Sequence, residues 1–150
     1  MPSKMRVYPD ANVYVALLLG ERDAGLANLF FKRSADCLFT LVVSKTTFAE
    51  VNSALGGRGT IWLQDHLDKF RGAGKLEVVE KDGRDVGDAH RLNLLAGGKF
   101  GLNDFLHALL AKRCADVFVT QDRAFARRAC RMVKAMSLAE FLAALEAKPG

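Results

Sequence analysis

Apolar residues along the chain fall into two alternating kinds of segment. Short continuous runs such as LFTLVV at residues 38–43 are typical of strands that are buried on both faces of a parallel sheet. Longer segments, for example residues 23–33, repeat their apolar positions at intervals of three and four, which predicts amphipathic helices. The pattern therefore indicates strands that alternate with helices along the whole chain.

Turn and capping residues set the limits of these elements. Pro9 ends the first strand, Gly20 ends the first helix, and Ser44 is a good N-cap for the helix that Gly56 ends. The predicted strands cover residues 5–8, 38–43, 75–79, 117–120 and 131–135. The predicted helices cover residues 11–19, 23–33, 45–55, a segment from Thr60 to 70, 85–95, a helix opened by Asn103 or Asp104, 123–130, and a last one capped by Ser137.

This order predicts an α/β fold. Strands that alternate with helices form right-handed βαβ units, so we expect a three-layer α/β/α sandwich around a central parallel sheet of four or five strands. The chain has 150 residues and no linker or repeat, which indicates one domain over residues 1–150. A chain of this size buries roughly two-thirds of its unfolded surface without help from disulfides or metals.

Composition adds little to the predicted fold, but it argues against some classes of protein. Lys and Arg outnumber Asp and Glu by 22 to 17, and this surplus would attract a polyanion such as RNA, although it also serves solubility. Cys37, Cys114 and Cys130 have neither CxxC nor Cys/His spacing, so we expect no disulfide framework and no zinc site. The apolar run at 13–19 is shorter than the ~20 residues that cross a bilayer. We expect a cytoplasmic protein without a membrane partner.

Four acidic residues are candidates for chemistry. Asp10 and Asp122 follow strands, and ligands of open parallel sheets bind beyond the carboxyl ends of the strands. Asp104 opens a helix before the fourth strand, and Glu50 lies in the helix after the second. Taken singly, each Asp is also a good helix cap and Glu50 an ordinary surface residue. One shared acidic site would explain all four.

The sequence resembles PIN domains at five places. VYPDANVYVALL (7–18) is similar to the opening of these domains, TTFAEVNSAL (46–55) to their helix with an acidic residue, GLNDFLHALLA (101–111) to their third acidic motif and VFVTQDRAF (117–125) to their fourth. VKAMSLAEFLAAL (133–145) resembles their closing strand and helix. Among PIN domains, the small VapC-type toxins of bacteria and archaea are the most similar in size.

The resemblance implies a function. It implies a metal-dependent endoribonuclease that hydrolyses RNA phosphodiester bonds, as the toxin of a toxin–antitoxin pair. Asp10, Asp104 and Asp122 would hold Mg²⁺ or Mn²⁺, and Glu50 a second cation or a water. The expected partners are the RNA substrate, a second copy of the chain, with exposed apolar surface on the early helices, and a cognate antitoxin.

Polar and basic residues near the four acidic residues are candidates for orienting ligands or for binding RNA. Asn12 and Thr120 lie two residues from Asp10 and Asp122, where they could orient ligands or water, or serve merely as ordinary polar groups of a helix and a strand end. A basic group follows Asp122 and could bind RNA phosphates, or simply be solvated; it comprises Arg123, Arg127, Arg128, Arg131 and Lys134. His107 lies three residues after Asp104 on one helical face, so it could reach a substrate phosphate or a carboxylate, but it is interpreted as a partly buried structural histidine. Tyr14 and Trp62 could stack on bases, but they are interpreted as packing residues.

Three rival functions remain to be compared. A phospho-receiver domain has a similar core, with Thr120 and Lys134 as candidate residues, but it carries a pair of acidic residues after its first strand, and here Ala11 follows Asp10. A haloacid-dehalogenase-like phosphatase needs a D-x-D pair where this chain has Asp10 and Asn12. A non-catalytic RNA-binding module on the same fold is disfavoured by the four intact carboxylates.

Overall fold

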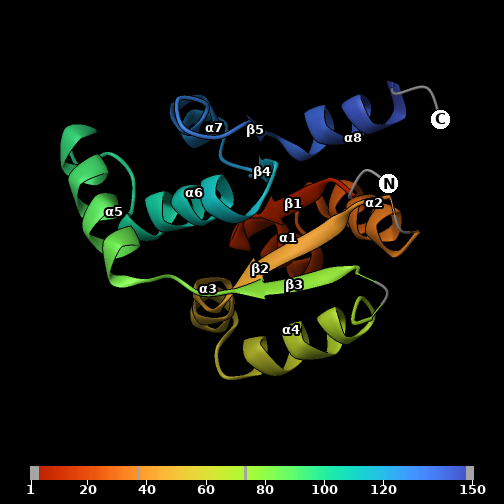
Figure 1. The fold of residues 1–150 in the computed structure, drawn as a ribbon. Coiled ribbons are helices and arrows are strands. Elements are labelled where there is room, and N and C mark those ends of the chain that lie inside the picture. The colour runs from red at the N-terminus through yellow and green to blue at the C-terminus, as the bar shows by residue number, and fades with distance from the viewer. Residues whose placement is uncertain (1–3, 37, 73, 148–150) are drawn as a thin grey trace.

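A five-stranded parallel sheet forms the centre of the protein in this computed structural model, which describes residues 4–36, 38–72 and 74–147. The strand order is β3-β2-β1-β4-β5, and it can be followed in Figure 1. All four pairings are parallel, which confirms the expected α/β fold. The strands are β1 (Arg6–Pro9), β2 (Thr40–Ser44), β3 (Leu76–Val79), β4 (Val117–Val119) and β5 (Ala135–Met136).

Helices cover both faces of the sheet and complete the three layers. One hydrophobic cluster packs a first group of helices on the sheet: α1 (Ala11–Leu19), α2 (Ala24–Ala35), α3 (Lys45–Leu55), α4 (Arg58–Asp68) and α8 (Leu138–Ala147). A second cluster packs the others on the opposite face: α5 (Gly83–Leu95), α6 (Leu102–Cys114) and α7 (Arg123–Ala129). Figure 1 shows α5 at the far end of the molecule from α8.

Successive strand residues point to opposite faces, and this alternation decides which helix each one meets. Val7 of β1 belongs to the first cluster, whereas the next residue, Tyr8, belongs to the second. The same holds in β4, where Val117 and Val119 face one layer and Phe118 the other. Tyr8 is therefore directed toward α6, the helix that carries Asp104 and His107.

Several predicted boundaries were wrong by a few residues. β2 begins at Thr40 instead of residue 38, because Leu38 still donates its N–H to Arg33 O at the end of α2 and its side chain is 48% exposed. The fifth strand is Ala135–Met136 instead of 131–135, since the N–H groups of Met132 and Val133 remain bonded to Ala129 O in the turn after α7. Local apolar runs do not reveal where a helix stops winding.

Two predicted helix starts also move. α6 begins at Leu102 with Gly101 as its N-cap, so Asp104 is the third residue of the helix instead of its opening residue. α4 begins at Arg58 after Gly57, and Thr60 does not cap it. Both corrections shift an expected cap by one turn or less, and they leave the order of elements unchanged.

The residues interpreted as packing residues do pack. Tyr14 is fully buried, and the Trp62 ring stacks on His66 with ring centroids 5.1 Å apart. Cys114 and Cys130 are free thiols, while Cys37 lies outside the described residues. Within the described ranges, no helix combines the length and apolar character that crossing a lipid bilayer requires.

Candidate active site

The carboxyl ends of β1 and β4 bring Asp10 and Thr120 together. Pro9 is in register with Val119, and the N–H of Asp10 donates to Val119 O at 2.8 Å. Thr120 follows at the same edge of the sheet, and its hydroxyl donates to Asp10 Oδ2 at 2.9 Å. Two residues that are 110 positions apart in sequence are thus held in direct contact.

Asp10 is buried and carries a charge that its surroundings disfavour. Its Oδ1 accepts the N–H of Ala11 at 2.7 Å, so the residue caps α1 as well. Burial raises the pKa of Asp10 from 3.8 to about 6; the charge of His107 opposes this rise, while those of Glu50 and Asp104 add to it. Ionised Asp10 therefore costs more free energy here than in water, and further positive charge nearby would make ionisation easier.

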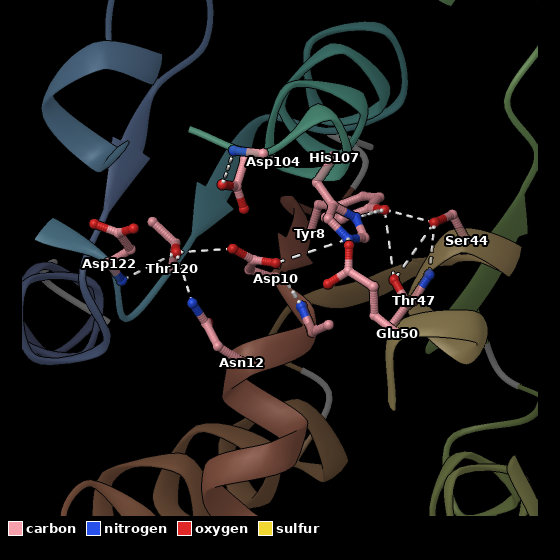
Figure 2. Close-up of polar contacts among 12 residues, drawn as sticks. Tyr8, Asp10, Asn12, Ser44, Thr47, Glu50, Asp104, His107, Thr120 and Asp122 are labelled. Carbon is pink, nitrogen blue, oxygen red and sulfur yellow. Dashed lines mark hydrogen bonds and ion pairs between the residues drawn. The ribbon is translucent and has the colours of Figure 1, made fainter. Parts of the chain in front are cut away.

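Glu50 and His107 complete a compact group with Asp10. Ser44 caps α3, and Glu50 lies on the face of that helix that turns toward α6 (Figure 2). Glu50 Oε1 is 3.0 Å from His107 Nε2, and the same nitrogen is 3.8 Å from Asp10 Oδ1. One donor atom from each of the three residues lies within 4.8 Å of the others. Glu50 is half-buried in this group.

His107 reaches a carboxylate, that of Glu50, which its position after Asp104 had left open beside the preferred structural role. Its side chain is fully buried, and its Nδ1 is 2.6 Å from the Tyr8 hydroxyl, which is in turn 2.6 Å from Ser44 Oγ. Burial alone would lower the pKa of His107, but Tyr8, the hydrogen bond to Glu50 and the negative charge of Asp10 hold it well above 6.5. The only signal was its position one helical turn after Asp104.

Asp104 lies beside this group. Its Oδ2 accepts the N–H of Gly101 at 3.0 Å, and Figure 2 shows its carboxylate directed toward Asp10. Burial raises the pKa of Asp104; the hydrogen bond from Gly101 lowers it, and the charges of Glu50 and Asp122 raise it again. Asp104 therefore belongs to the same electrostatic cluster, although it is outside the three-residue group.

Asp122 lies at the outer side of the cluster. Its side chain is exposed, and its Oδ1 accepts the N–H of Phe125 at 3.0 Å as the N-cap of α7. Figure 2 shows Thr120 between Asp122 and Asp10. Asp122 therefore caps α7 and lies outside the three-residue group, while its charge helps to raise the pKa of Asp104.

Asn12 and Thr120 form a second layer around the carboxylates. Asn12 Nδ2 donates to Thr120 Oγ1 at 3.1 Å, and Asn12 Oδ1 accepts the N–H of Gln121, also at 3.1 Å. The N–H of Asp122 donates to Thr120 Oγ1 at 3.2 Å. The Thr120 hydroxyl therefore accepts two hydrogen bonds while it donates to Asp10, and the loop after β4 is fixed against α1.

The basic residues lie on α7 and just after it. Arg123, Arg127 and Arg131 are exposed and Arg128 is half-buried. Lys134 is exposed in the connection to β5. None of these five forms an ion pair with a described residue.

The donor set suits a hard divalent cation. Sites for Mg²⁺ and Mn²⁺ in proteins consist of carboxylate oxygens from a few residues, together with waters that the ion retains. The carboxylates of such a site repel each other, and the bound cation relieves this repulsion. Asp10 supplies the strongest sign of fit, because its pKa is raised while its oxygens lie beside Glu50 and His107.

Several solved structures have a fold similar to that of this protein. No curated protein matches the sequence. Among solved structures, VapBC2 from Rickettsia felis, bound to a DNA fragment from its promoter, is similar with a TM-score of 0.63 at 20% identity, over 89% of this chain and 98% of that one. PAE2754 from Pyrobaculum aerophilum has a TM-score of 0.61 at 20% identity, over 97% and 100% of the two chains. FitAcB from Neisseria gonorrhoeae has a TM-score of 0.57 at 17% identity, over 89% and 98%.

The family of this protein is identified from its sequence. The family model described as PIN domain matches residues 7–130, a span that includes all four candidate carboxylates and most of the sheet. The likeness to the solved structures concerns the fold, and the sequence match covers well over half of the chain. The protein therefore belongs to the PIN-domain family, a family of nucleases.

Proposed function

We propose that this protein is an endoribonuclease that hydrolyses RNA phosphodiester bonds with Mg²⁺ or Mn²⁺. The observation that carries the proposal is the buried Asp10, whose pKa is raised to about 6 beside Glu50 and Asp104. Such a cluster is costly for a purely structural role, since each carboxylate makes its neighbour harder to ionise. Membership of a nuclease family favours this function over a phospho-receiver domain.

In this proposal each carboxylate has a role. Asp10, Asp104 and Asp122 hold the cation, and Glu50 holds a second cation or a water. When bound, the cation supplies neutralisation of the phosphoryl oxygens and a lower pKa for a water. Thr120 and the N–H of Ala11 fix both oxygens of Asp10, while His107 fixes one oxygen of Glu50.

Space for a substrate adjoins these residues. A cleft of about 310 Å³ has a polar lining that includes Asn12, Glu21, Arg22, Asp23, Glu50 and Gln121. It opens beside the carboxylates, so a strand of RNA bound along it would pass Glu50. The arginines on α7, Arg123 and Arg127 among them, would bind phosphates on the other side of Asp122.

We extend the proposal to a toxin that an antitoxin inhibits, acting in the cytoplasm, where its RNA substrate is. Two of the similar structures, VapBC2 and FitAcB, are of toxin–antitoxin pairs, and this supports a protein partner for the acidic cleft. Exposed apolar side chains on the early helices, Leu19 of α1 and Ile61 of α4, support a homodimer. Light scattering that gives only a monomer at micromolar concentration would contradict the dimer.

One experiment tests the catalytic part. The purified protein is incubated with labelled RNA in Mg²⁺, in Mn²⁺ and in chelator, and Asp10→Asn is treated identically. We expect cleavage by the wild type with metal only, and none by the variant. Equal cleavage by the variant would identify a contaminant, and RNA binding without cleavage would favour the non-catalytic module.

A further inference from the structure

The basic residues on α7 are divided between two hollows. Arg123 and Arg127 line one near the start of α8, whereas Arg127, Arg128 and Arg131 line a second, a cleft of about 260 Å³ on the other side of α7. The opposite wall of this second cleft comes from the segment before α6, which contributes Lys99 and Phe100. We call it the α7 cleft.

The α7 cleft is lined by cations without acidic partners. Ala96 and Ala124 complete its lining, so none of its lining residues is acidic. Lys99, Arg128 and Arg131 form no ion pair with any residue in the described part of the chain. The hollow nearer α8 differs, since Glu140 lies in its lining with Arg123 and Arg127. Like charges gathered in one concave site repel each other, and an anionic ligand relieves that repulsion.

An aromatic ring is fixed among these cations. Phe100 is half-buried and packs edge-on against Phe105 and Phe125, with ring centroids 6.1 and 5.1 Å apart. Lys99 Nζ lies 5.7 Å from the centroid of the Phe100 ring. Sites for single-stranded nucleic acids combine an aromatic ring, on which a base stacks, with cations that follow the backbone.

Both walls of the α7 cleft are joined to the candidate active site. Phe100 precedes Gly101, whose N–H is bonded to the carboxylate of Asp104. On the other wall, α7 begins immediately after its N-cap, Asp122. A strand of RNA that leaves the carboxylates between Asp104 and Asp122 would therefore enter the α7 cleft directly.

We propose that the α7 cleft binds nucleotides of single-stranded RNA that flank the bond to be cleaved. Lys99, Arg128 and Arg131 contact the phosphates, and a base packs against Phe100. This inference rests on the proposed ribonuclease function and names where that substrate continues beyond the carboxylates. Neither the sequence comparison nor the acidic cluster assigns a role to Lys99 or Phe100.

The test measures RNA binding without cleavage. A labelled twelve-nucleotide single-stranded RNA is titrated with Asp10→Asn protein, and fluorescence anisotropy is recorded at several salt concentrations. The double substitution Arg128→Gln with Arg131→Gln is compared with Lys32→Gln with Lys69→Gln, which removes the same charge from exposed positions on α2 and immediately after α4. We expect the arginine pair to weaken binding about 10- to 30-fold near 0.1 M salt and to flatten the salt dependence. The lysine pair should change binding less than twofold.

A third variant tests the ring. Phe100→Leu keeps an apolar side chain against Phe105 and Phe125, so the fold is retained, and thermal unfolding checks this. We expect about fivefold or greater loss of affinity with an unchanged salt dependence, because stacking is lost and no charge is removed.

The outcomes separate this inference from the proposed function. Equal losses of RNA affinity in the arginine and lysine variants would mean that RNA binding depends only on net charge. This would overturn the proposed role of the α7 cleft. Wild-type cleavage, with the KM for the twelve-nucleotide RNA unchanged in the arginine pair, would overturn the cleft and leave the ribonuclease intact. Selective loss of binding in a protein that never cleaves would support the α7 cleft as an RNA-binding site, but it would overturn the ribonuclease and, with it, the claim that the bound nucleotides flank a cleaved bond. Tighter binding of an acidic peptide than of RNA, lost in the arginine pair, would make the cleft a protein-binding site and also refute the proposal.

Discussion

Replacement of Asp10 by Asn should stabilise the metal-free protein at pH 8. The pKa of Asp10 rises from 3.8 to about 6 on folding, mainly through burial, and this corresponds to about 3 kcal/mol at 25 °C. Asn is neutral and of the same size, but it can accept only one of the two hydrogen bonds that Asp10 accepts from Ala11 and Thr120, a loss of about 1 kcal/mol. The expected net gain in the free energy of unfolding is about 2 kcal/mol.

The pH dependence gives this prediction its sign. The folded protein binds the Asp10 proton more tightly than the unfolded chain does, so the stability that protonation contributes is complete below about pH 3.8. It is lost as the pH rises through about 6. The advantage of Asp10→Asn should therefore be large at pH 8 and absent or reversed at pH 4.5.

Urea unfolding in chelator, followed by circular dichroism from pH 4.5 to 8, measures both quantities. Asp65→Asn is the matched control, because Asp65 is exposed on α4, and its effect should be small at every pH. If Asp10→Asn were destabilising by the same amount at pH 8 and pH 4.5, the reasoning from buried charge would be refuted. Asp10 would then act chiefly as the cap of α1.

Three further substitutions probe other contacts. Gly59→Ala should destabilise by about 1–3 kcal/mol, since its Cβ would lie 2.6 Å from a backbone oxygen of α3; Gly57→Ala, with open space around it, should be near neutral in the same urea experiment. Thr120→Val removes one donated and two accepted hydrogen bonds and should lower RNA cleavage about 10- to 100-fold; unchanged rates would dismiss its positioning role. Tyr8→Phe leaves His107 Nδ1 without its buried partner and should cost about 1–3 kcal/mol of unfolding free energy, and a wild-type urea midpoint would contradict this.

Sequence reasoning gave the order of elements because it depends on patterns that are local. Continuous apolar runs predicted strands covered on both faces, and all five strands were found in a parallel sheet. The predicted ends of the strands were less accurate, because a strand begins only where its N–H and carbonyl groups form hydrogen bonds with a neighbouring strand. Leu38 and Val133 look like strand residues, yet both still bond to the preceding helix.

The candidate site was predictable only in part, for a physical reason. Acidic residues after strands could be expected to converge, and the negative charge of Glu50 does help to raise the pKa of both Asp10 and Asp104. Two roles for His107 stayed open, contact with a carboxylate and structural packing, because a histidine on an apolar helix face looks the same in sequence whether or not a tyrosine and a glutamate contact it. Its partners Tyr8 and Glu50 are 99 and 57 residues away.

The pairing of β1 with β4 has a consequence for the synthesis of the protein on the ribosome. During synthesis Asp10 leaves the ribosome early. Thr120, whose hydroxyl donates a hydrogen bond to Asp10, is added 110 residues later, directly after the strand β4 that pairs with β1. Contacts so distant along the chain form only after the intervening segment has been made. Until then a growing chain lacks the geometry described above, so a nuclease built in this way stays inactive while it is still being synthesised.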